Sequence, residues 1–353
     1  MTRPRPAKAR WAALPVLALL LAASCAHARD NPDPLFESAT ELTVTLQADW
    51  RQILRNKEDE TRHPAVLGYV DDAGREHRIE ATVETRGITR LRICRFPPLR
   101  IRFKRDVTRG TEFDGERSLK MVTHCRTGPA YEQYYVQELI AFRIYNRVTD
   151  HSFRVRPLLI TYLDMDGDTR AGPAFAFLIE DDDDVARRNG HREGQRMPLA
   201  PGDYDPLALT RFMLFQYLIG NTDWSVLGRP GLEKCCHNVR VTGPEDGPGL
   251  VALPYDFDSS GMVDADYAAP HESLPIRSVT ERLYRGFCLH NDSLGPVRDE
   301  FLANRETILA IVRDEARLSP GRERVLVRYF GEFYATLGDP ASFAREITGK
   351  CRR

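Results

Sequence analysis

Three side chains in the middle of the chain have types and positions suited to chemistry on a phosphoryl group. Asp223 follows an apolar run with helical spacing at residues 209–219, and Asn238 opens a short β-branched run. A second strand-like run at residues 250–254 leads directly into Asp256. In phosphoryl transfer one aspartate orients the nucleophile, while an asparagine and another aspartate hold metal. These three residues can therefore converge on one Mg²⁺ ion and one phosphoryl group.

The motifs around these residues resemble those of a known family. Gly220-Asn-Thr-Asp223, His237-Asn238 and Pro254-Tyr-Asp256 are similar to the catalytic and metal loops of the atypical protein-kinase-like lineage that includes the HipA toxin kinases and the spore-coat CotH kinases. The resemblance implies that Asp223 is the catalytic base and that ATP is the phosphoryl donor. It implies as ligands of Mg²⁺ or Mn²⁺ the residues Asn238, Asp256 and, additionally, Asp258.

The chain departs from this family in one respect. In those kinases the asparagine follows the catalytic aspartate after only a few residues. Here an insertion with Gly, Pro and the adjacent Cys235 and Cys236 separates Asp223 from Asn238. The distance in space between the base and the metal ligands is therefore the property that the resemblance predicts least directly.

Three residues upstream have the order of nucleotide-binding residues. In protein kinases a strand lysine contacts the phosphates and pairs with a glutamate of the following helix. Lys120, in a predicted strand, and Glu138, in a predicted long helix, have this order, and Glu180 stands where CotH-type kinases carry a glutamate between their lobes. The alternatives are an edge-strand lysine, an exposed helical glutamate and, for Glu180, the start of the solvated acidic run 181–184.

Arginines lie in and after the segment Val83–Gly87, which resembles the Arg-Gly segment of CotH-type kinases. Arg86, Arg90 and Arg92 are candidates to bind phosphate. The alternative, and the more frequent use of arginines in such a basic stretch, is solvated surface charge.

Alternation of apolar and polar residues predicts a β-rich first half, and helical periodicity predicts a mainly α-helical second half. The predicted fold class is α+β, a two-lobed protein-kinase-like fold with an antiparallel N-lobe sheet and one long helix at residues 29–182, and a mainly helical C-lobe at 183–353. The expected strands are 42–46, 65–70, 77–84, 99–103, 118–124, 154–162, 173–180, 239–242 and 250–254, and the expected helices are 131–148, 209–219, 278–288, 297–316 and 321–337.

Residues 1–28 have the pattern of a secretory signal peptide. Four cations precede an apolar run at residues 11–23, which is too short for a membrane span, and Ala26-His27-Ala28 is a cleavage site. We therefore expect an exported protein, periplasmic or secreted. The run Leu21–Cys25 is an imperfect lipobox, so a lipid anchor at Cys25 stays open as the one expected route to a membrane.

Charge and cysteine content limit the classes of ligand and the cellular compartment that we expect for this chain. The formal charge of the whole chain is −1, and removal of the signal leaves about −5, so no basic surface for nucleic acid is expected. Without Cys25 six cysteines remain, an even number that predicts disulfides in an exported protein. We expect Cys94 to pair with Cys125, because each lies at the end of a strand and the two strands are consecutive.

The leading hypothesis is an exported CotH-like kinase that transfers a nucleotide phosphoryl group to a protein or small hydroxyl acceptor. Two other classes stay open. A catalytically silent exported protein would use the same fold for binding alone. A metal-dependent phosphoesterase would bind its ion through Asp256, Asp258 and Asp264.

Overall fold

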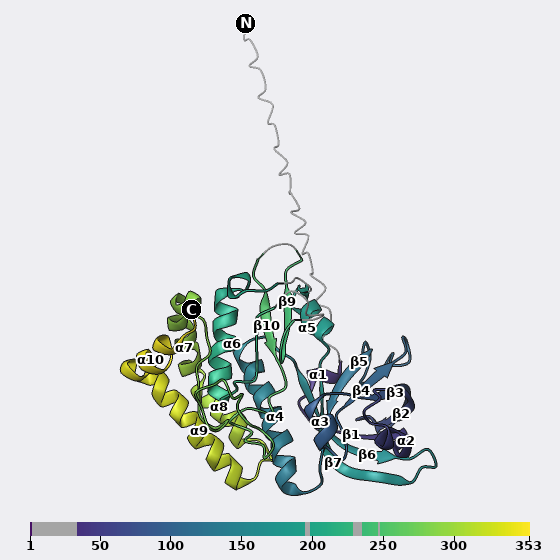
Figure 1. The fold of residues 1–353 in the computed structure, drawn as a ribbon. Coiled ribbons are helices and arrows are strands. Elements are labelled where there is room, and N and C mark those ends of the chain that lie inside the picture. The colour runs from purple at the N-terminus through teal and green to yellow at the C-terminus, as the bar shows by residue number, and fades with distance from the viewer. Residues whose placement is uncertain (2–33, 195–197, 229–234, 246–247) are drawn as a thin grey trace. The chain divides into compact units, whose positions relative to one another are not determined.

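Seven strands close into a barrel that is visible on the right of Figure 1. Neighbouring strands follow the order β1-β2-β3-β4-β5-β7-β6, and all but one of the pairs are antiparallel. The exception closes the barrel: β1 and β6 run parallel, with Leu42 opposite Leu158 and Gln47 opposite Leu163. The strands are β1 (Leu42–Ala48), β2 (His63–Val70), β3 (Glu76–Thr85), β4 (Leu99–Phe103), β5 (Ser118–Val122), β6 (Val155–Leu163) and β7 (Thr169–Ile179).

This computed structural model describes Met1 and residues 34–194, 198–228, 235–245 and 248–353. The predicted signal peptide, its cleavage site and Cys25 lie outside the described residues. Within the described ranges no helix combines the length and the apolar composition that crossing a bilayer requires. The described residues from 34 to 353 form one compact unit.

The predicted fold class is wrong. A two-lobed kinase-like fold has an open antiparallel sheet in its first lobe, whereas here the sheet is mixed and closed. Alternating burial along β1 shows which face of the strand is apolar, and this part of the pattern was readable in the sequence. Closure depends instead on pairing between β1 and β6, and the two strands are far apart in the chain.

Helices cover one side of the barrel and pack on each other on the left of Figure 1. Helix α4 contacts β6 and β7 as well as α6 and α8, so it joins the barrel to the helical part. The helices are α1 (Pro34–Glu37), α2 (Trp50–Arg55), α3 (Thr89–Ile93), α4 (Pro129–Val148), α5 (Asp182–Arg188), α6 (Pro206–Ile219), α7 (Leu294–Ala303), α8 (Arg305–Arg313), α9 (Pro320–Gly338) and α10 (Pro340–Glu346), with short 3-10 turns at Pro201–Asp203, Cys288–Ser293 and Thr348–Lys350.

A second, small sheet stands beside α6. It has the order β10-β9-β8, with β8 (Arg192–Glu193), β9 (Val239–Gly243) and β10 (Val251–Pro254). Val239 lies opposite Pro254, so the start of β9 and the end of β10 are neighbours. This register brings Asn238, which precedes β9, close to the residues that follow β10.

The predicted helix at residues 278–288 does not form. The segment is a loop up to the 3-10 turn at its end. The Arg282 side chain within it donates hydrogen bonds to the carbonyl oxygens of Tyr217 and Leu218, at 3.1 and 3.2 Å, and of Tyr329 at 2.6 Å. Carbonyl groups at the end of α6 thereby gain a side-chain donor, so a tertiary contact outweighs the local helical periodicity.

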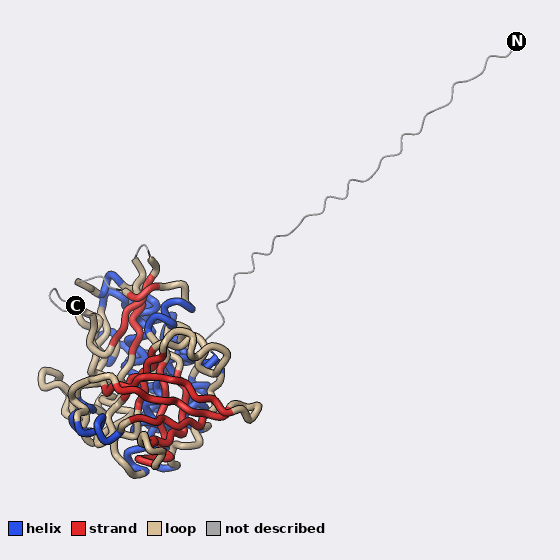
Figure 2. The backbone as a smooth tube through the Cα atoms, turned by 90° about the vertical axis from the view of Figure 1, so that its right-hand side faces the viewer, coloured by secondary structure: helices blue, strands red, loops and turns tan. Residues whose placement is uncertain are grey.

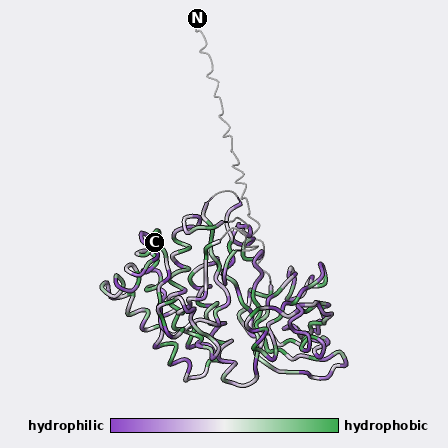
Figure 3. Tube along the Cα trace, in the orientation of Figure 1, coloured by the Kyte–Doolittle hydropathy of each residue, from purple (hydrophilic) through white to green (hydrophobic). Residues whose placement is uncertain are grey.

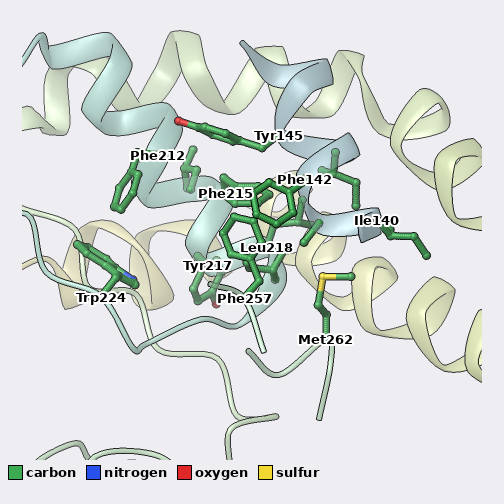
Figure 4. Packing of buried hydrophobic residues seen from close by; sticks show 14 of the residues in the cluster. Ile140, Phe142, Tyr145, Phe212, Phe215, Tyr217, Leu218, Trp224, Phe257 and Met262 are labelled. Carbon is green, nitrogen blue, oxygen red and sulfur yellow. The ribbon is translucent and has the colours of Figure 1, made fainter. Parts of the chain in front are cut away.

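The apolar core of the helical part anchors the two predicted functional loops through one aromatic residue of each. In Figure 4, Phe257 points into a cluster of aromatic rings from α4 and α6, and its ring centroid lies 4.7 Å from that of Phe142 and 5.5 Å from that of Phe215. Trp224 packs edge-on against Phe212 at 4.9 Å. The apolar residues of α4, α6 and the barrel strands can be followed in Figure 3.

Two disulfides connect distant segments. Cys94 pairs with Cys125, as predicted, with Cα atoms 4.5 Å apart. Cys288 pairs with Cys351, with Cα atoms 5.0 Å apart, and ties the C-terminal residues to the loop before α7. The first disulfide fixes the end of α3, which is important for the site described below.

The hydroxyl group of Tyr329 in α9 lies against two glycines, Gly220 and Gly261, and this close packing gives a stability prediction. A Cβ added at Gly261 would overlap the Tyr329 hydroxyl and the Val279 carbonyl oxygen. We expect Gly261→Ala to lower the free energy of unfolding by about 2–4 kcal/mol, because one obstacle is backbone. Urea denaturation measures this change.

A glycine in α9 provides the matched control. A Cβ at Gly331 meets no atom within 4 Å, so Gly331→Ala should be neutral or should raise stability by up to about 1 kcal/mol. Equal stabilities for the two alanine variants would contradict the packing described for Gly261.

Candidate functional site

The loop that carries Asp223 is fixed at both ends. Helix α6 ends at Gly220, which adopts the left-handed conformation with φ of 65°. The Asn221 side chain then accepts a hydrogen bond from the backbone N–H of Asp223 at 2.9 Å, and the Trp224 indole donates to the Asn221 carbonyl at 3.0 Å. Because Trp224 is buried, the adjacent Asp223 is held at the edge of the core with its carboxylate accessible.

The Asp223 carboxylate contacts His237 and Asn238, the two residues of the second motif. His237 Nε2 lies 2.6 Å from one oxygen, and Asn238 Nδ2 donates to the other at 3.0 Å. Burial acts to raise the pKa of Asp223, but the hydrogen bonds from His237 and Asn238 outweigh it and hold this pKa below its usual range. The hydrogen bond to Asp223 also raises the pKa of His237. Asp223 is therefore ionised at neutral pH.

The insertion between Asp223 and Asn238 does not separate them in space. The Asn238 amide also donates to the Asp223 carbonyl oxygen at 2.9 Å, and the Ser225 N–H donates to the His237 carbonyl at 3.0 Å. These hydrogen bonds hold the end of the insertion, at His237 and Asn238, against the loop that carries Asp223. The Asn238 side chain donates twice, while its amide oxygen accepts no hydrogen bond from a described residue.

Asp256 has the opposite environment. Its carboxylate accepts no hydrogen bond from any residue that the structure describes. Burial, reinforced by the negative charge of Asp258, raises the pKa of Asp256 to about 6. A carboxylate in this state gains most from a cation, so Asp256 is suited to hold one.

Backbone strain is found at the same two residues. Asn238 and Asp256 adopt positive φ angles of 53° and 63°. L-residues rarely adopt this region, although asparagine and aspartate tolerate it best. Such strain often occurs at functional sites, where the surrounding structure holds a side chain in a required direction. The buried Phe257 supplies this restraint for Asp256.

Asp258, predicted as a metal ligand, lies in a buried ion network. Arg90 Nε donates to Asp258 at 2.8 Å, and Arg90 Nη2 donates to Glu138 at 2.6 Å. The Tyr267 hydroxyl donates to the same Asp258 oxygen at 3.1 Å. Burial acts to lower the pKa of Arg90, but the charges of Asp258 and Glu138 raise it well above its usual value. The guanidinium thus occupies the position beside Asp258 where a cation would bind.

The expected pair of Lys120 and Glu138 is wrong. Glu138 pairs with Arg90, and the buried Lys120 pairs with Asp182 at the start of α5. Arg240 also pairs with Asp182, at 2.9 Å. Burial lowers the pKa of Lys120, and the negative charge of Asp182 opposes this shift. Asp182, which lies in the run for which a solvated segment was the alternative, is therefore a half-buried anion between two cations.

Both carboxylate oxygens of Glu180 also have hydrogen-bond partners within the protein. It accepts hydrogen bonds from Arg188 at 2.8 and 3.1 Å and from the backbone N–H of Arg154 at 2.9 Å. The side chain is buried at the junction between β7 and α5. Glu180 therefore fixes this junction, and its carboxylate has no free oxygen directed at a ligand.

Arg86 is the cation that faces Asp256 without a partner of its own. Its guanidinium makes no hydrogen bond or ion pair with a residue in the described ranges, although its backbone N–H is held by the Pro98 carbonyl at 3.0 Å. Burial lowers the pKa of Arg86, and the charge of Asp256 opposes this effect. Arg92, two residues after the buried Arg90, is exposed and is surface charge.

Clusters of three or more His, Cys, Asp or Glu side chains suited to a metal ion do not occur among the described residues. This applies to the set of Asp256, Asp258 and Asp264 that a phosphoesterase would use. Asp264 is exposed, and Asp258 is engaged by Arg90. Asp256 and the amide oxygen of Asn238 remain as neighbouring candidate ligands.

Sequence reasoning did not assign the residues that complete the site. Arg90 was considered only as one of three arginines, and its position one turn before Cys94 in a short helix was the available signal. Asp182 was hidden in an acidic run, and Arg240 in a short strand. Neither the models of known protein families nor the curated proteins contain a match to this chain.

The buried network gives a second stability prediction. Arg90→Leu leaves the Glu138 and Asp258 carboxylates buried without their cation, so the free energy of unfolding should fall by about 3–5 kcal/mol. Arg92→Leu, a change at an exposed position of the same helix, should alter it by less than about 0.5 kcal/mol. Chemical denaturation at neutral pH compares the two variants. Similar values would show that the network contributes little.

The raised pKa of Asp256 predicts a pH effect. The folded protein binds this proton more tightly than the unfolded chain, so stability from this group falls as pH rises from about 4 to about 6. With a chelator present, Asp256→Asn should exceed the wild type in stability by about 1–2 kcal/mol above this window and lose the advantage below it. Thermal unfolding across pH measures this crossover. A less stable Asp256→Asn variant at every pH would identify the carboxylate as structural.

Proposed function

We propose that the chain is a metal-dependent phosphotransferase, which transfers the terminal phosphoryl group of a nucleotide to a hydroxyl acceptor on a protein or small molecule. The proposal rests on the chemistry of the site, supported by the resemblance of the three loops to those of CotH-type and HipA-type kinases. It does not depend on the fold class expected from that resemblance.

One observation carries the proposal. Asp256 and Arg86 lie near enough for the charge of each to act on the pKa of the other, yet neither side chain has a hydrogen-bonding partner among the described side chains. The two opposite charges do not form an ion pair with each other in this partly buried site. A ligand that places a cation beside the aspartate and an anion beside the arginine would give each of them a partner. A metal–phosphate complex has this arrangement of charge, and Mg²⁺ is commonly held by one or two carboxylates together with substrate phosphates.

The residues fit such a group without a full protein cage. Asp256 and the amide oxygen of Asn238 would hold Mg²⁺ or Mn²⁺, and the ion would neutralise charge on the phosphates. Asp258 is left out of this set, because Arg90 and Tyr267 already engage it. The carboxylate of Asp258 acts instead on Asp256, whose pKa it raises.

The residues around Asp223 would handle the acceptor. An ionised carboxylate at the edge of the core accepts a hydrogen bond from an acceptor hydroxyl, orients its oxygen and takes its proton as the new P–O bond forms and the P–O bond to the leaving nucleoside diphosphate breaks. His237 and Asn238 fix the carboxylate in one orientation. Arg285 supports the loop from behind by donating to the carbonyl oxygens of Thr222 and Trp224, the latter at 3.0 Å.

Lys120 would have an indirect role in the site as described. Its ammonium is paired with Asp182, so Arg86 is the cation available for phosphate. Lys120 and Arg240 lie over the ring of Tyr255, at 5.8 and 4.9 Å from its centroid. They therefore fix the residue that precedes Asp256.

Two substitutions separate the proposed roles. Asp256→Ala should abolish the Mg²⁺-dependent rise in melting temperature that ATP produces, because binding to the native state raises it. Asp223→Asn should keep this rise and lower turnover by about 10²- to 10⁴-fold, the usual contribution of a positioned base. Differential scanning fluorimetry and ATP hydrolysis or autophosphorylation provide the two readouts.

Arg86→Gln should weaken ATP binding, and Arg92→Gln, at an exposed position nearby, should not. If the wild type shows no metal-dependent nucleotide binding, the proposal fails and a catalytically silent binding protein is the better description. If the wild type hydrolyses p-nitrophenyl phosphate with metal but without nucleotide, the protein is better described as a phosphoesterase.

A further inference from the structure

A groove of about 620 Å³ lies on the outer face of the barrel, away from the loops of the candidate site. Residues of β2, β3 and β4 form its floor: Pro64 lies opposite Thr82, and Thr82 opposite Arg102. These positions alternate along their strands with core residues, so their side chains point outward. Figure 2 views the molecule from the side of the barrel strands. The volume is within the range of about 300–1,000 Å³ that is typical of ligand sites.

The turn between β6 and β7 forms one wall of the groove. Gln47 Nε2 donates to the carbonyl oxygens of Asp164 and Met165, at 3.3 and 3.2 Å, and this holds the turn against the sheet. Gln47 pairs across the strands with Val66 on the floor. The Met165 side chain is 60% exposed although it lines the groove. An apolar side chain held in solvent beside Val66 and Pro64 provides a contact surface for an apolar group.

Positive charge surrounds this apolar floor. The lining contains four cations, Arg62, Arg102, Lys104 and Arg117, and a single acid, Glu80. Arg62 and Arg102 both pair with Glu84, each at 2.9 Å, and Arg100 also lies 3.5 Å from it, so one carboxylate is shared among three guanidinium groups. Lys104 and Arg117 are exposed and have no ion pair with a described residue. The excess is local, because the whole chain has a formal charge of −1.

We propose that this groove binds an acidic peptide segment of a partner protein, with an apolar side chain of the peptide between Val66 on the floor and Met165 on the wall, and its carboxylates toward Lys104 and Arg117. Charge complementarity of this kind selects partners and speeds association. The inference does not depend on the proposed phosphotransferase activity.

Other occupants fit the groove less well. The N-terminal segment of this chain carries Arg3, Arg5, Lys8 and Arg10 and would be repelled. A nucleic acid or an anionic membrane calls for a continuous basic surface, whereas Glu80 and apolar side chains interrupt this one. An acidic peptide with an apolar anchor matches both the charges at the rim and the floor.

Fluorescence anisotropy of the folded mature protein tests the proposal. The probe is a labelled short peptide with a central leucine flanked by glutamates, and its partner probe has glutamines in their place. We expect saturable binding of the acidic peptide, at least about tenfold weaker binding of the glutamine peptide, and weakening by salt. The paired change Lys104→Glu with Arg117→Glu should reduce affinity by at least about tenfold, and Met165→Asp should also reduce it.

A paired change elsewhere controls for net charge. Arg324→Glu with Arg328→Glu on α9 makes the same change at exposed positions far along the chain and should leave binding unchanged. All substituted side chains are exposed, and circular dichroism verifies folding.

Three outcomes would overturn the proposal. The first is no saturable binding of the acidic peptide. The second is equal loss of binding in the groove variants and in the α9 control. The third is binding of single-stranded DNA or phosphatidylglycerol vesicles as tightly as the peptide, with the same loss in the groove variants, since the surface would then be a general polyanion site.

Discussion

Arg90 joins three segments that are widely separated in the sequence. From α3 it reaches Glu138 on α4 at 2.6 Å and Asp258 after β10 at 2.8 Å, and all three side chains are buried. A buried guanidinium requires such partners, because an unpaired charge in this environment is strongly unfavourable. Arg90 occupies both acids, while Lys120 pairs with Asp182 and Asp256 keeps a carboxylate without a hydrogen bond from the described residues. The position of Arg90 thus decides which cation meets Glu138 and Asp258.

The loops of the site combine strain with anchoring. Each candidate acid is followed by an aromatic residue in the core, Trp224 after Asp223 and Phe257 after Asp256. The anchors fix the position of the backbone, and the left-handed conformations of Asn238 and Asp256 then set the direction of the side chains. A rigid, polar site can thus form at the surface of an apolar core, which is the arrangement that positions catalytic groups before substrate binds.

The sequence predicted local structure better than long-range structure. Alternation located β1 and β4, helical periodicity located α6 and α9, and the spacing of cysteines around two strands indicated the Cys94–Cys125 disulfide. The motif also predicted that Asp223 and Asn238 lie close together in space, although an insertion separates them in the sequence. Barrel closure and the partners of Lys120 and Glu138 were not predictable, because they depend on contacts between distant segments. The pattern of residues in one sequence does not predict which cation will form an ion pair with a buried acid.

The parallel pairing of β1 with β6 has a consequence for how the chain is made. Leu42 cannot pair with Leu158 until the ribosome has added the intervening residues, which takes on the order of ten seconds at about 5–20 residues per second. During this interval one edge of β1 has no partner strand, and an unpaired edge is a template for association with other chains. The nascent chain of this protein therefore exposes an unpaired edge of β1 until β6 has been synthesised, and closure of the barrel has to wait for this long-range contact.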